Sequence, residues 1–283
     1  MIPVVSYFTF IRPGNAAMAG GAVALGFWLS HADRPLWELL LLMISAVCAT
    51  GFGNVINDIR DIESDKINHP DRPLPTGEIS PFAAGVFALL LLITALLCAY
   101  LVSWLHLAAT AVPCILLFFY ARRLKATPLA GNIIVSLLVA YPIIYGGLGA
   151  EHREYLFAPA ALAFLLNLIR EIVKDIQDSP GDTDSGIITT ASLPETVIKI
   201  ILYALTLVYT VLLFIPYSFG HFQKPYLIIV LALIIPLHLY TVMHLLSSQW
   251  KQQLGKLSKL TKLELLFGLA ALAVDRGIGE WMG

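Results

Sequence analysis

Hydrophobic residues fill long stretches of this chain, and charged residues lie almost entirely between them. Seven stretches of fifteen or more consecutive positions contain no Asp, Glu, Lys or Arg: 13–32, 39–57, 79–121, 127–150, 155–169, 200–223 and 225–250. A helix needs about 20 mostly apolar residues to cross a bilayer. The pattern therefore predicts a series of transmembrane helices rather than a soluble domain.

Two further observations bring the expected number of spans to nine. Residues 79–121 are too long for one span, and the polar step Ser103-Trp104-Leu105-His106 divides them into two. Residues 155–174 form the sixth span, and residues 260–281 are interrupted by charges but long enough to form the last. We therefore expect an all-α polytopic membrane protein with nine transmembrane helices in a single domain over residues 1–283.

Composition and charge support a membrane protein and indicate its orientation. Of the 283 residues, 58% are hydrophobic and 13% are charged, against about 25% charged in soluble domains. The net charge of −1 gives no reason to expect a nucleic-acid partner. With a cytoplasmic N-terminus, 14 of the 18 Lys and Arg residues lie on the cytoplasmic side. The positive-inside rule then predicts that the two long polar loops, residues 59–80 and 176–194, face the cytoplasm. We expect a protein of the cell membrane whose active site lies on this cytoplasmic side, because functional residues often lie in such loops.

The first long loop follows a run of amide and carboxylate side chains, Asn54, Asn57, Asp58, Asp61 and Asp65. At about 100° per residue, all five share one stripe if the helix continues. Carboxylates stacked at the membrane boundary repel each other, so a metal ion or a polycation must compensate them. Oxygen ligands without Cys or clustered His favour Mg²⁺, Ca²⁺ or Mn²⁺ over zinc. The simpler alternative is a helix end exposed to water. Such an end would not require these amide and carboxylate side chains to align on one face.

The second long loop follows a mixed basic and acidic run. One helix face carries Asn167, Arg170, Lys174 and Asp178, flanked by Glu171 and Asp175. Pro180-Gly181 is expected to end this helix and to leave Asp182 on a loop. Such residues are costly at membrane depth unless they are paired or functional. The alternative to a binding site is an ion-pair network that only locks helices together.

Basic side chains lie between the two acidic runs, which share a short repeat. Asp58-Ile59-Arg60-Asp61 recurs as Asp175-Ile176-Gln177-Asp178, which suggests two equivalent acidic sites that face each other. Arg72 lies in a loop with two prolines, and Lys125 precedes the fifth span. Phosphate groups are usually held by Arg and Lys together with a metal ion. We therefore expect Arg72 and Lys125 to contact an anionic ligand.

These motifs together resemble the UbiA superfamily of membrane prenyltransferases. The matching segments are Asn57-Asp58-x-x-Asp61-x-x-x-Asp65, Asp178-x-x-x-Asp182, Arg12-Pro13-x-Asn15, Arg72-Pro73-Leu74-Pro75-x-Gly77 and Leu124-Lys125-x-x-Pro128-Leu129-x-Gly131-Asn132. The resemblance covers nearly the whole chain in order. It implies nine helices around a central cavity with a cytoplasmic-side cap, and Mg²⁺-dependent transfer of a polyprenyl group from its diphosphate.

The resemblance also assigns roles to residues, as hypotheses. The predicted catalytic carboxylates are Asp58, Asp61, Asp65, Asp178 and Asp182. One Mg²⁺ is expected on Asn54, Asp58 and Asp61, and another on Asp178 and Asp182. The predicted substrate-binding residues are Arg12, Asn15, Asn54, Asn57, Arg72, Lys125, Arg170, Lys174 and Asp175. The expected partners are a polyprenyl diphosphate, a lipophilic acceptor and membrane lipid.

The acceptor and the class of protein each have an alternative. Residues 170–182 most resemble the archaeal-type geranylgeranylglyceryl phosphate geranylgeranyltransferases, which form an ether bond to a glycerol hydroxyl. The runner-up is an aromatic acceptor, as in quinone biosynthesis. A secondary transporter would place its carboxylates near the membrane midplane on broken helices. Here they gather at helix ends on one face, which favours an enzyme.

Overall fold

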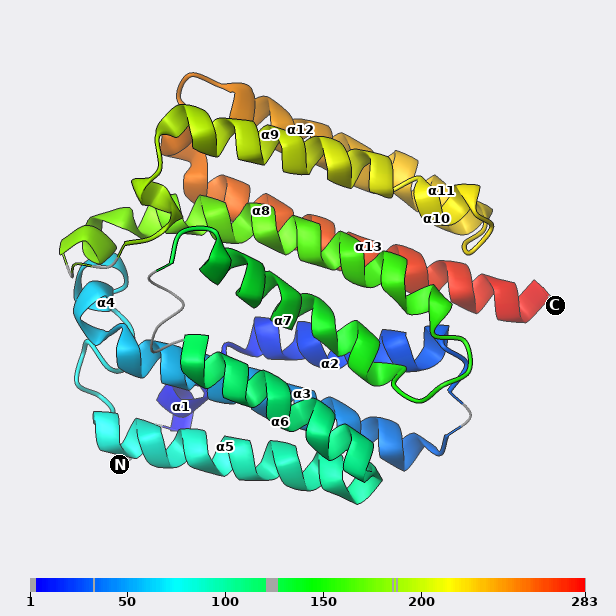
Figure 1. Cartoon of the computed structure of the whole chain (residues 1–283), viewed down its shortest axis with the longest axis horizontal. Coiled ribbons are helices and arrows are strands. Elements are labelled where there is room, and N and C mark those ends of the chain that lie inside the picture. Colours follow the sequence, from blue (N-terminus) through cyan, green and yellow to red (C-terminus); the bar gives the residue numbers. More distant parts are fainter. Residues whose placement is uncertain (1–3, 33, 121–126, 185, 187, 283) are drawn as a thin grey trace.

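The structure, a computed structural model, describes residues 4–32, 34–120, 127–184, 186 and 188–282 (Figure 1). Every regular element in these ranges is a helix, which confirms the all-α prediction. The α-helices are α1 (Val4–Ile11), α2 (Pro13–Leu29), α3 (Leu36–Arg60), α4 (Ile62–Asn68), α5 (Pro81–Val102), α6 (Trp104–Phe119), α7 (Ala130–Gly146), α8 (Glu154–Asp184), α9 (Glu195–Leu212), α10 (Ile215–Ser218), α11 (Lys224–Ile229), α12 (Ile235–Leu246) and α13 (Leu254–Met282). A π-helical segment, Val230–Ile234, joins α11 to α12.

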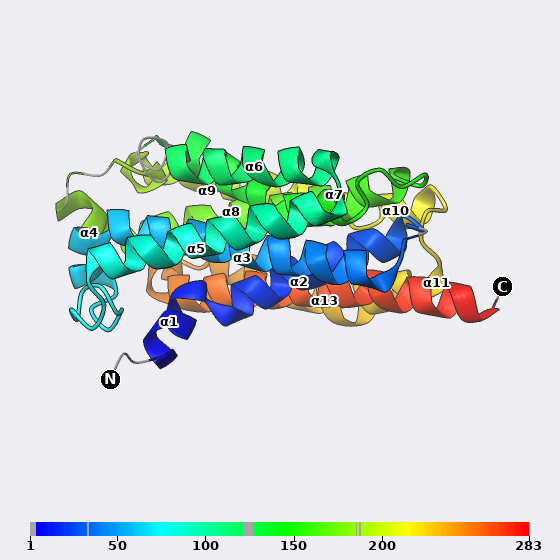
Figure 2. The same cartoon turned by 90° about the horizontal axis from the view of Figure 1, so that it is seen from below.

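The long helices lie side by side with their axes in a common direction (Figures 1 and 2). α3 packs against α2 and α5, and α8 packs against α7, α9 and α13. The last helix, α13, also contacts α2 near the start of the chain. The short helix α4 lies against α8 at one end of the molecule. The two acidic runs, which are more than a hundred residues apart in sequence, therefore meet at this end.

Five helical segments are long and apolar enough to cross a bilayer: Leu36–Arg60, Pro81–Val102, Glu154–Asp184, Glu195–Ser218 and Lys224–Leu246. The other long helices are either shorter, like α2, α6 and α7 with 16 or 17 residues, or carry charges, like α13. Large apolar side chains cover the outside of α5, where Leu89, Leu90, Ile93 and Leu97 are all more than half exposed. Such a surface suits lipid rather than water. The chain is thus a helical membrane protein, and the full set of nine spans stays a prediction.

The division of residues 79–121 falls at the polar step that the sequence indicated. α5 ends and α6 begins at Ser103, whose backbone is extended (φ −170°, ψ 162°). The Ser103 hydroxyl accepts a hydrogen bond from the backbone N–H of His106 at 3.2 Å. This N-cap satisfies a backbone donor at the start of α6, so the serine explains why one apolar stretch becomes two helices.

Two glycines allow α2 and α7 to approach closely. A Cβ atom on Gly26 would lie 1.9 Å from the carbonyl oxygen of Ile143, and one on Gly146 would lie 2.0 Å from that of Val23. No side chain fits at either position without moving a backbone. Small residues at helix interfaces are a common device for packing inside membranes, where backbones must come close to gain contact.

The end of α8 differs from the prediction. Pro180-Gly181 was expected to end the helix, yet α8 continues to Asp184 and contains Asp182, which is buried. The side chain of Asn68 on α4 donates to the Asp178 carbonyl at 2.7 Å and accepts from the Gly181 N–H at 3.1 Å. Asn68 thus supplies partners for backbone groups on both sides of the proline, and these bonds offset the cost of a proline inside a helix.

Candidate active site

A cavity of about 480 Å³ opens among the long helices and reaches the end of the molecule where α4 meets α8. Its lining comes from α2, α3, α4, α6, α7, α8 and α13. Charged and amide side chains gather where α3, α4 and α8 end. Farther along these helices the lining is mostly apolar and includes Ala22, Ala46, Leu138, Pro142 and Leu265. The cavity therefore combines a polar end with an apolar remainder.

The first acidic run lies where α3 gives way to α4. Asp58, Asp61 and Asp65 are all buried, with 3–4% of their surface exposed. Asp61 and Asp65 line the cavity, as do Asn54 and Asn57. Asn57 donates to Asp61 Oδ2 at 2.7 Å, and Asn54 donates to the Ile11 carbonyl at 3.0 Å. Four of the five residues of the predicted stripe therefore line the cavity, and Asp58 does not.

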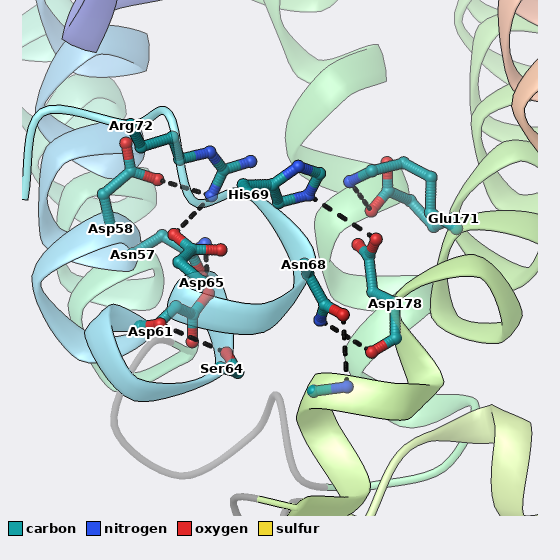
Figure 3. Close-up of polar contacts among 12 residues, drawn as sticks. Asn57, Asp58, Asp61, Ser64, Asp65, Asn68, His69, Arg72, Glu171 and Asp178 are labelled. Carbon is teal, nitrogen blue, oxygen red and sulfur yellow. Dashed lines mark hydrogen bonds and ion pairs between the residues drawn. The ribbon is translucent and has the colours of Figure 1, made fainter. Parts of the chain in front are cut away.

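Asp58 is absent from the cavity lining and is held by two arginines. Arg12 donates to Asp58 Oδ1, and Arg72 Nη1 lies 3.4 Å from the same oxygen. Arg72 Nη1 also donates to Asp65 Oδ2 at 2.5 Å, so this guanidinium joins α3 to α4 (Figure 3). Arg12 has the left-handed backbone φ of 52°, which costs about 1 kcal/mol in a non-glycine residue. The ion pair with Asp58 helps to hold this conformation.

Asp65 has a perturbed acidity that follows from its surroundings. Burial raises the pKa of its carboxyl group above the usual value, because the charged form loses hydration. Arg72 opposes this effect through its charge and its hydrogen bond, whereas the charges of Asp58 and Asp61 raise the pKa further. The three carboxylates of Asp58, Asp61 and Asp65 exceed the two guanidinium groups of Arg12 and Arg72 by one negative charge, which attracts a cation.

The second acidic run faces the first across the cavity. Asp178 and Asp182 on α8 both line it, and His69 Nε2 on the α4 side lies 3.5 Å from Asp178 Oδ1 (Figure 3). A Cβ on Gly181 would lie 2.6 Å from both Asn68 Nδ2 and the Ser64 carbonyl oxygen. The absence of a side chain at residue 181 therefore lets α8 approach α4 and brings the two runs together.

The mixed residues of α8 divide into two groups. Arg170 Nη1 donates to Glu171 Oε1 at 2.6 Å, and Lys174 lies 3.4 Å from Glu171 Oε2, so this ion-pair network is confined to one helix. Asp175 Oδ2 accepts from Asn132 on α7 at 3.0 Å and from the Thr190 N–H at 3.1 Å. Asp175 therefore ties three segments together, while Arg170, Glu171 and Lys174 all line the cavity.

The structure brings most of the predicted site residues into one lining. These are Arg12, Asn15, Asn54, Asn57, Asp61, Asp65, Arg72, Arg170, Lys174, Asp175, Asp178 and Asp182. Lys125 lies outside the described residues. Sequence reasoning missed Asn68, His69 and Lys262, which also line the cavity. Of these, only Lys262 had a signal in the sequence, as a charge that interrupts the last apolar segment.

The carboxylates that line the polar end of the cavity fit a metal ion that is coordinated partly by the protein and partly by a bound ligand. Within the described ranges, no three His, Cys, Asp or Glu side chains are grouped closely enough to hold a metal ion by themselves. This arrangement does not fit a closed structural zinc site. It fits Mg²⁺, which usually takes one or two carboxylates and fills its other positions with water and phosphate oxygens.

Comparison with known proteins identifies the family. A model of the UbiA prenyltransferase family matches residues 19–263 of this chain. The chain belongs to the UbiA prenyltransferase family. It is therefore a prenyltransferase, as the sequence motifs indicated, and not the ion-coupled transporter considered as an alternative.

Several full-length relatives of this UbiA prenyltransferase carry the same name, digeranylgeranylglyceryl phosphate synthase. The protein from Methanopyrus kandleri is 35% identical over 271 residues, which cover 94% of this chain and 97% of the relative. The protein from Methanobrevibacter smithii is 35% identical over 280 residues, with coverage of 95% and 96%. The predicted resemblance to this group is confirmed.

Solved structures support the UbiA fold. A structure of a digeranylgeranylglyceryl phosphate synthase is 29% identical, with a TM-score of 0.77 over 98% of this chain and 99% of that one. A UbiA homologue from Archaeoglobus fulgidus, bound to GPP and Mg²⁺, is 22% identical, with a TM-score of 0.67 and coverage of 95% and 99%. At that identity the second comparison supports the fold alone.

Proposed function

We propose that this UbiA prenyltransferase uses Mg²⁺ to transfer a geranylgeranyl group from geranylgeranyl diphosphate to the glycerol hydroxyl of geranylgeranylglyceryl phosphate. The observation that carries the proposal is one cavity with facing acidic runs at its polar end and an apolar remainder. Such a cavity fits an amphiphile with a charged head and a long hydrocarbon tail. The name shared by the full-length relatives supports this choice of donor and acceptor.

The polar end of the cavity would hold the diphosphate and its metal ions. Asp61 and Asp65 on one side, and Asp178 and Asp182 on the other, would each supply oxygen ligands to a Mg²⁺. Asp58 is less suited to this role than the sequence suggested, because it does not line the cavity, whereas Asp65 lines it even though Arg72 contacts both carboxylates. Bound Mg²⁺ supplies positive charge that stabilises the diphosphate as it leaves.

The apolar part of the cavity would take the prenyl tail. Ser45, at its far end, is twelve residues before Asn57 on α3, which corresponds to about 18 Å along the helix. There the hydroxyl groups of Thr110, Tyr145 and Ser45 bond to one another, at 2.9 Å for Thr110 to Tyr145 and 3.2 Å for Tyr145 to Ser45. Because these hydroxyls bond to one another, they need no water as a hydrogen-bonding partner, and this end of the cavity would stay dry around the prenyl tail.

The reaction breaks the bond between C1 of the prenyl group and the diphosphate oxygen, and it forms an ether bond from C1 to the acceptor hydroxyl. The leaving group keeps the bonding electrons, so negative charge develops on the diphosphate and positive charge on the allylic carbon. Arg72 and Lys174 would stabilise the diphosphate charge. The apolar wall excludes water, which would otherwise quench the cation. The hydroxyl proton leaves to a carboxylate that lines the cavity.

We also propose the topology that the sequence predicted. α2, α3, α5, α6, α7, α8, α9, α11 with α12, and α13 would be the nine spans of a single domain over residues 1–283. The loops around α4 and after α8 would form a cap on the cytoplasmic side of the cell membrane. The excess of Lys and Arg on that side supports this orientation.

A panel of acceptors tests the proposed function. Purified full-length protein in detergent is incubated with geranylgeranyl diphosphate, Mg²⁺ and either geranylgeranylglyceryl phosphate, 4-hydroxybenzoate or dihydroxynaphthoate. Mass spectrometry should detect digeranylgeranylglyceryl phosphate, and EDTA should prevent its formation. Prenylation of an aromatic acceptor alone would contradict the proposed acceptor while keeping the reaction class.

A further inference from the structure

The cavity contains a second group of basic side chains that the acidic runs do not explain. Lys262 on α13 and Arg170 on α8 line the cavity together with Asn15 in the first turn of α2. α13 packs against both α2 and α8, so residues almost 250 positions apart in sequence meet here. Figures 1 and 2 show α13 running beside these helices.

Lys262 differs from the other basic side chains that the structure describes in this lining, because it has no carboxylate partner. Each of the other Lys and Arg residues forms an ion pair: Arg12, Arg72, Arg170 and Lys174. The Lys262 ammonium instead donates to Asn15 Oδ1 at 2.9 Å. A neutral amide orients the ammonium group but leaves its charge uncompensated. An anion can therefore bind to Lys262 without displacing an acidic side chain.

Arg170 adds a second positive charge to this part of the cavity. Its Nη1 donates to Glu171, whereas its Nε is buried and has no hydrogen-bond partner among the described residues. Arg170 and Lys174 share the single carboxylate of Glu171, so these three side chains and Lys262, which all line the cavity, carry two more positive charges than negative ones. Excess positive charge inside a membrane protein is unfavourable, and an anion bound beside Lys262 and Arg170 would offset it.

The position of Arg170 on α8 sets this pair apart from Asp178 and Asp182, the carboxylates at the polar end. Arg170 precedes Asp178 by eight residues on α8, which is about 12 Å along the helix. Gly14 leaves room for the Lys262 side chain, because a Cβ at that residue would lie 3.3 Å from Nζ. Ser258, one turn before Lys262, also lines the cavity and adds a hydroxyl donor. These residues therefore line a part of the cavity that lies away from Asp178 and Asp182.

We infer that Lys262 and Arg170 bind the phosphomonoester group of the lipid acceptor, with Asn15 as the residue that positions Lys262. This inference rests on the proposed function. The acceptor proposed above carries a phosphate that takes no part in bond formation, and the donor's diphosphate occupies the acidic end. Anchoring the acceptor by its phosphate places the glycerol hydroxyl between the two anions, near C1 of the donor.

The test compares acceptors with and without the phosphate group. Wild-type protein, Lys262→Gln and Lys262→Arg are assayed with geranylgeranylglyceryl phosphate and with geranylgeranylglycerol at saturating donor. Loss of one charged hydrogen-bonding group should lower kcat/KM for the phosphorylated acceptor about 10- to 100-fold. The rate with geranylgeranylglycerol and the KM for geranylgeranyl diphosphate should not change. Lys262→Arg should retain most of the activity because it keeps the positive charge.

Lys259→Gln is the matched control, since Lys259 is an exposed lysine on the same helix and does not line the cavity. It should behave as wild type in every assay. Direct binding of geranylgeranylglyceryl phosphate, measured by calorimetry, separates the subsite from turnover. Weaker binding to Lys262→Gln than to Lys259→Gln supports the subsite even if no ether product forms, which would contradict only the proposed function. Three results would overturn the inference: equal binding to Lys262→Gln and Lys259→Gln, no binding to the wild-type protein, or a Lys262→Gln variant whose KM rises for geranylgeranyl diphosphate and not for the acceptor.

Discussion

The contact between α4 and α8 should control both the stability and the metal affinity of the site. Gly181→Ala places a methyl group 2.6 Å from Asn68 Nδ2 and from the Ser64 carbonyl oxygen. Because the Ser64 oxygen belongs to the backbone, the helices must separate. Overpacking of this kind costs about 1–3 kcal/mol. Asn68→Ala removes the two hydrogen bonds at 2.7 and 3.1 Å, which at about 0.5–1.5 kcal/mol each is a similar loss.

Thermal unfolding of the purified variants measures this effect. Each kcal/mol corresponds to about 2–4 °C in Tm for chains of 150–250 residues, so both variants should unfold several degrees below wild type. They should also need more Mg²⁺ to bind geranylgeranyl diphosphate, because Asp178 and Asp182 move away from Asp61. Gly85→Ala in α5 is the control, since a Cβ there contacts nothing within 4 Å. If Gly181→Ala matched Gly85→Ala in Tm and in Mg²⁺ requirement, the contact would not position the site.

Three further changes test other parts of the account. Asp61→Asn should lower kcat at least about 10²-fold with an unchanged Tm, and wild-type turnover in a kinetic assay would remove Asp61 from the site. Ala46→Phe fills the apolar part of the cavity, so it should lower kcat/KM for geranylgeranyl diphosphate more than for geranyl diphosphate; equal losses would mean that the tail lies elsewhere. Gly26→Ala should destabilise by about 1–3 kcal/mol or more in thermal unfolding, because its Cβ meets the Ile143 oxygen at 1.9 Å, whereas Gly21→Ala on the same helix, with no contact within 4 Å, should not.

The features that could be predicted from the sequence depend on neighbours along the chain. The polar step at Ser103 divides two helices because a serine can cap the second, and that capping needs only the next three residues. The spacing of Asn57, Asp61 and Asp65 predicted that all three share one side of a helix. The break between α3 and α4 is brief, so α4 continues nearly the same helical register as α3 and the three side chains stay on that side. The family motifs then indicated that Asp178 and Asp182 belong to the same site.

The features that could not be predicted depend on contacts between distant segments. Pro180 was expected to end α8, but the Asn68 side chain satisfies the backbone around it, and no local pattern contains that contact. Asp58 is an aspartate like Asp61 and Asp65 and lies next to Asn57, yet it does not line the cavity, and its carboxylate contacts two arginines that precede and follow α3. Lys262 enters the site only because α13 returns to α2, 247 residues from Asn15.

The most direct test of the central claim follows the bond that forms. Purified full-length protein is given geranylgeranyl diphosphate and geranylgeranylglyceryl phosphate, and tandem mass spectrometry identifies the product while released diphosphate is quantified. The account predicts one diphosphate released for each ether-linked digeranylgeranylglyceryl phosphate formed, with both absent in EDTA and restored by Mg²⁺. Diphosphate release without an ether product, or ether formation that continues in EDTA, would contradict it.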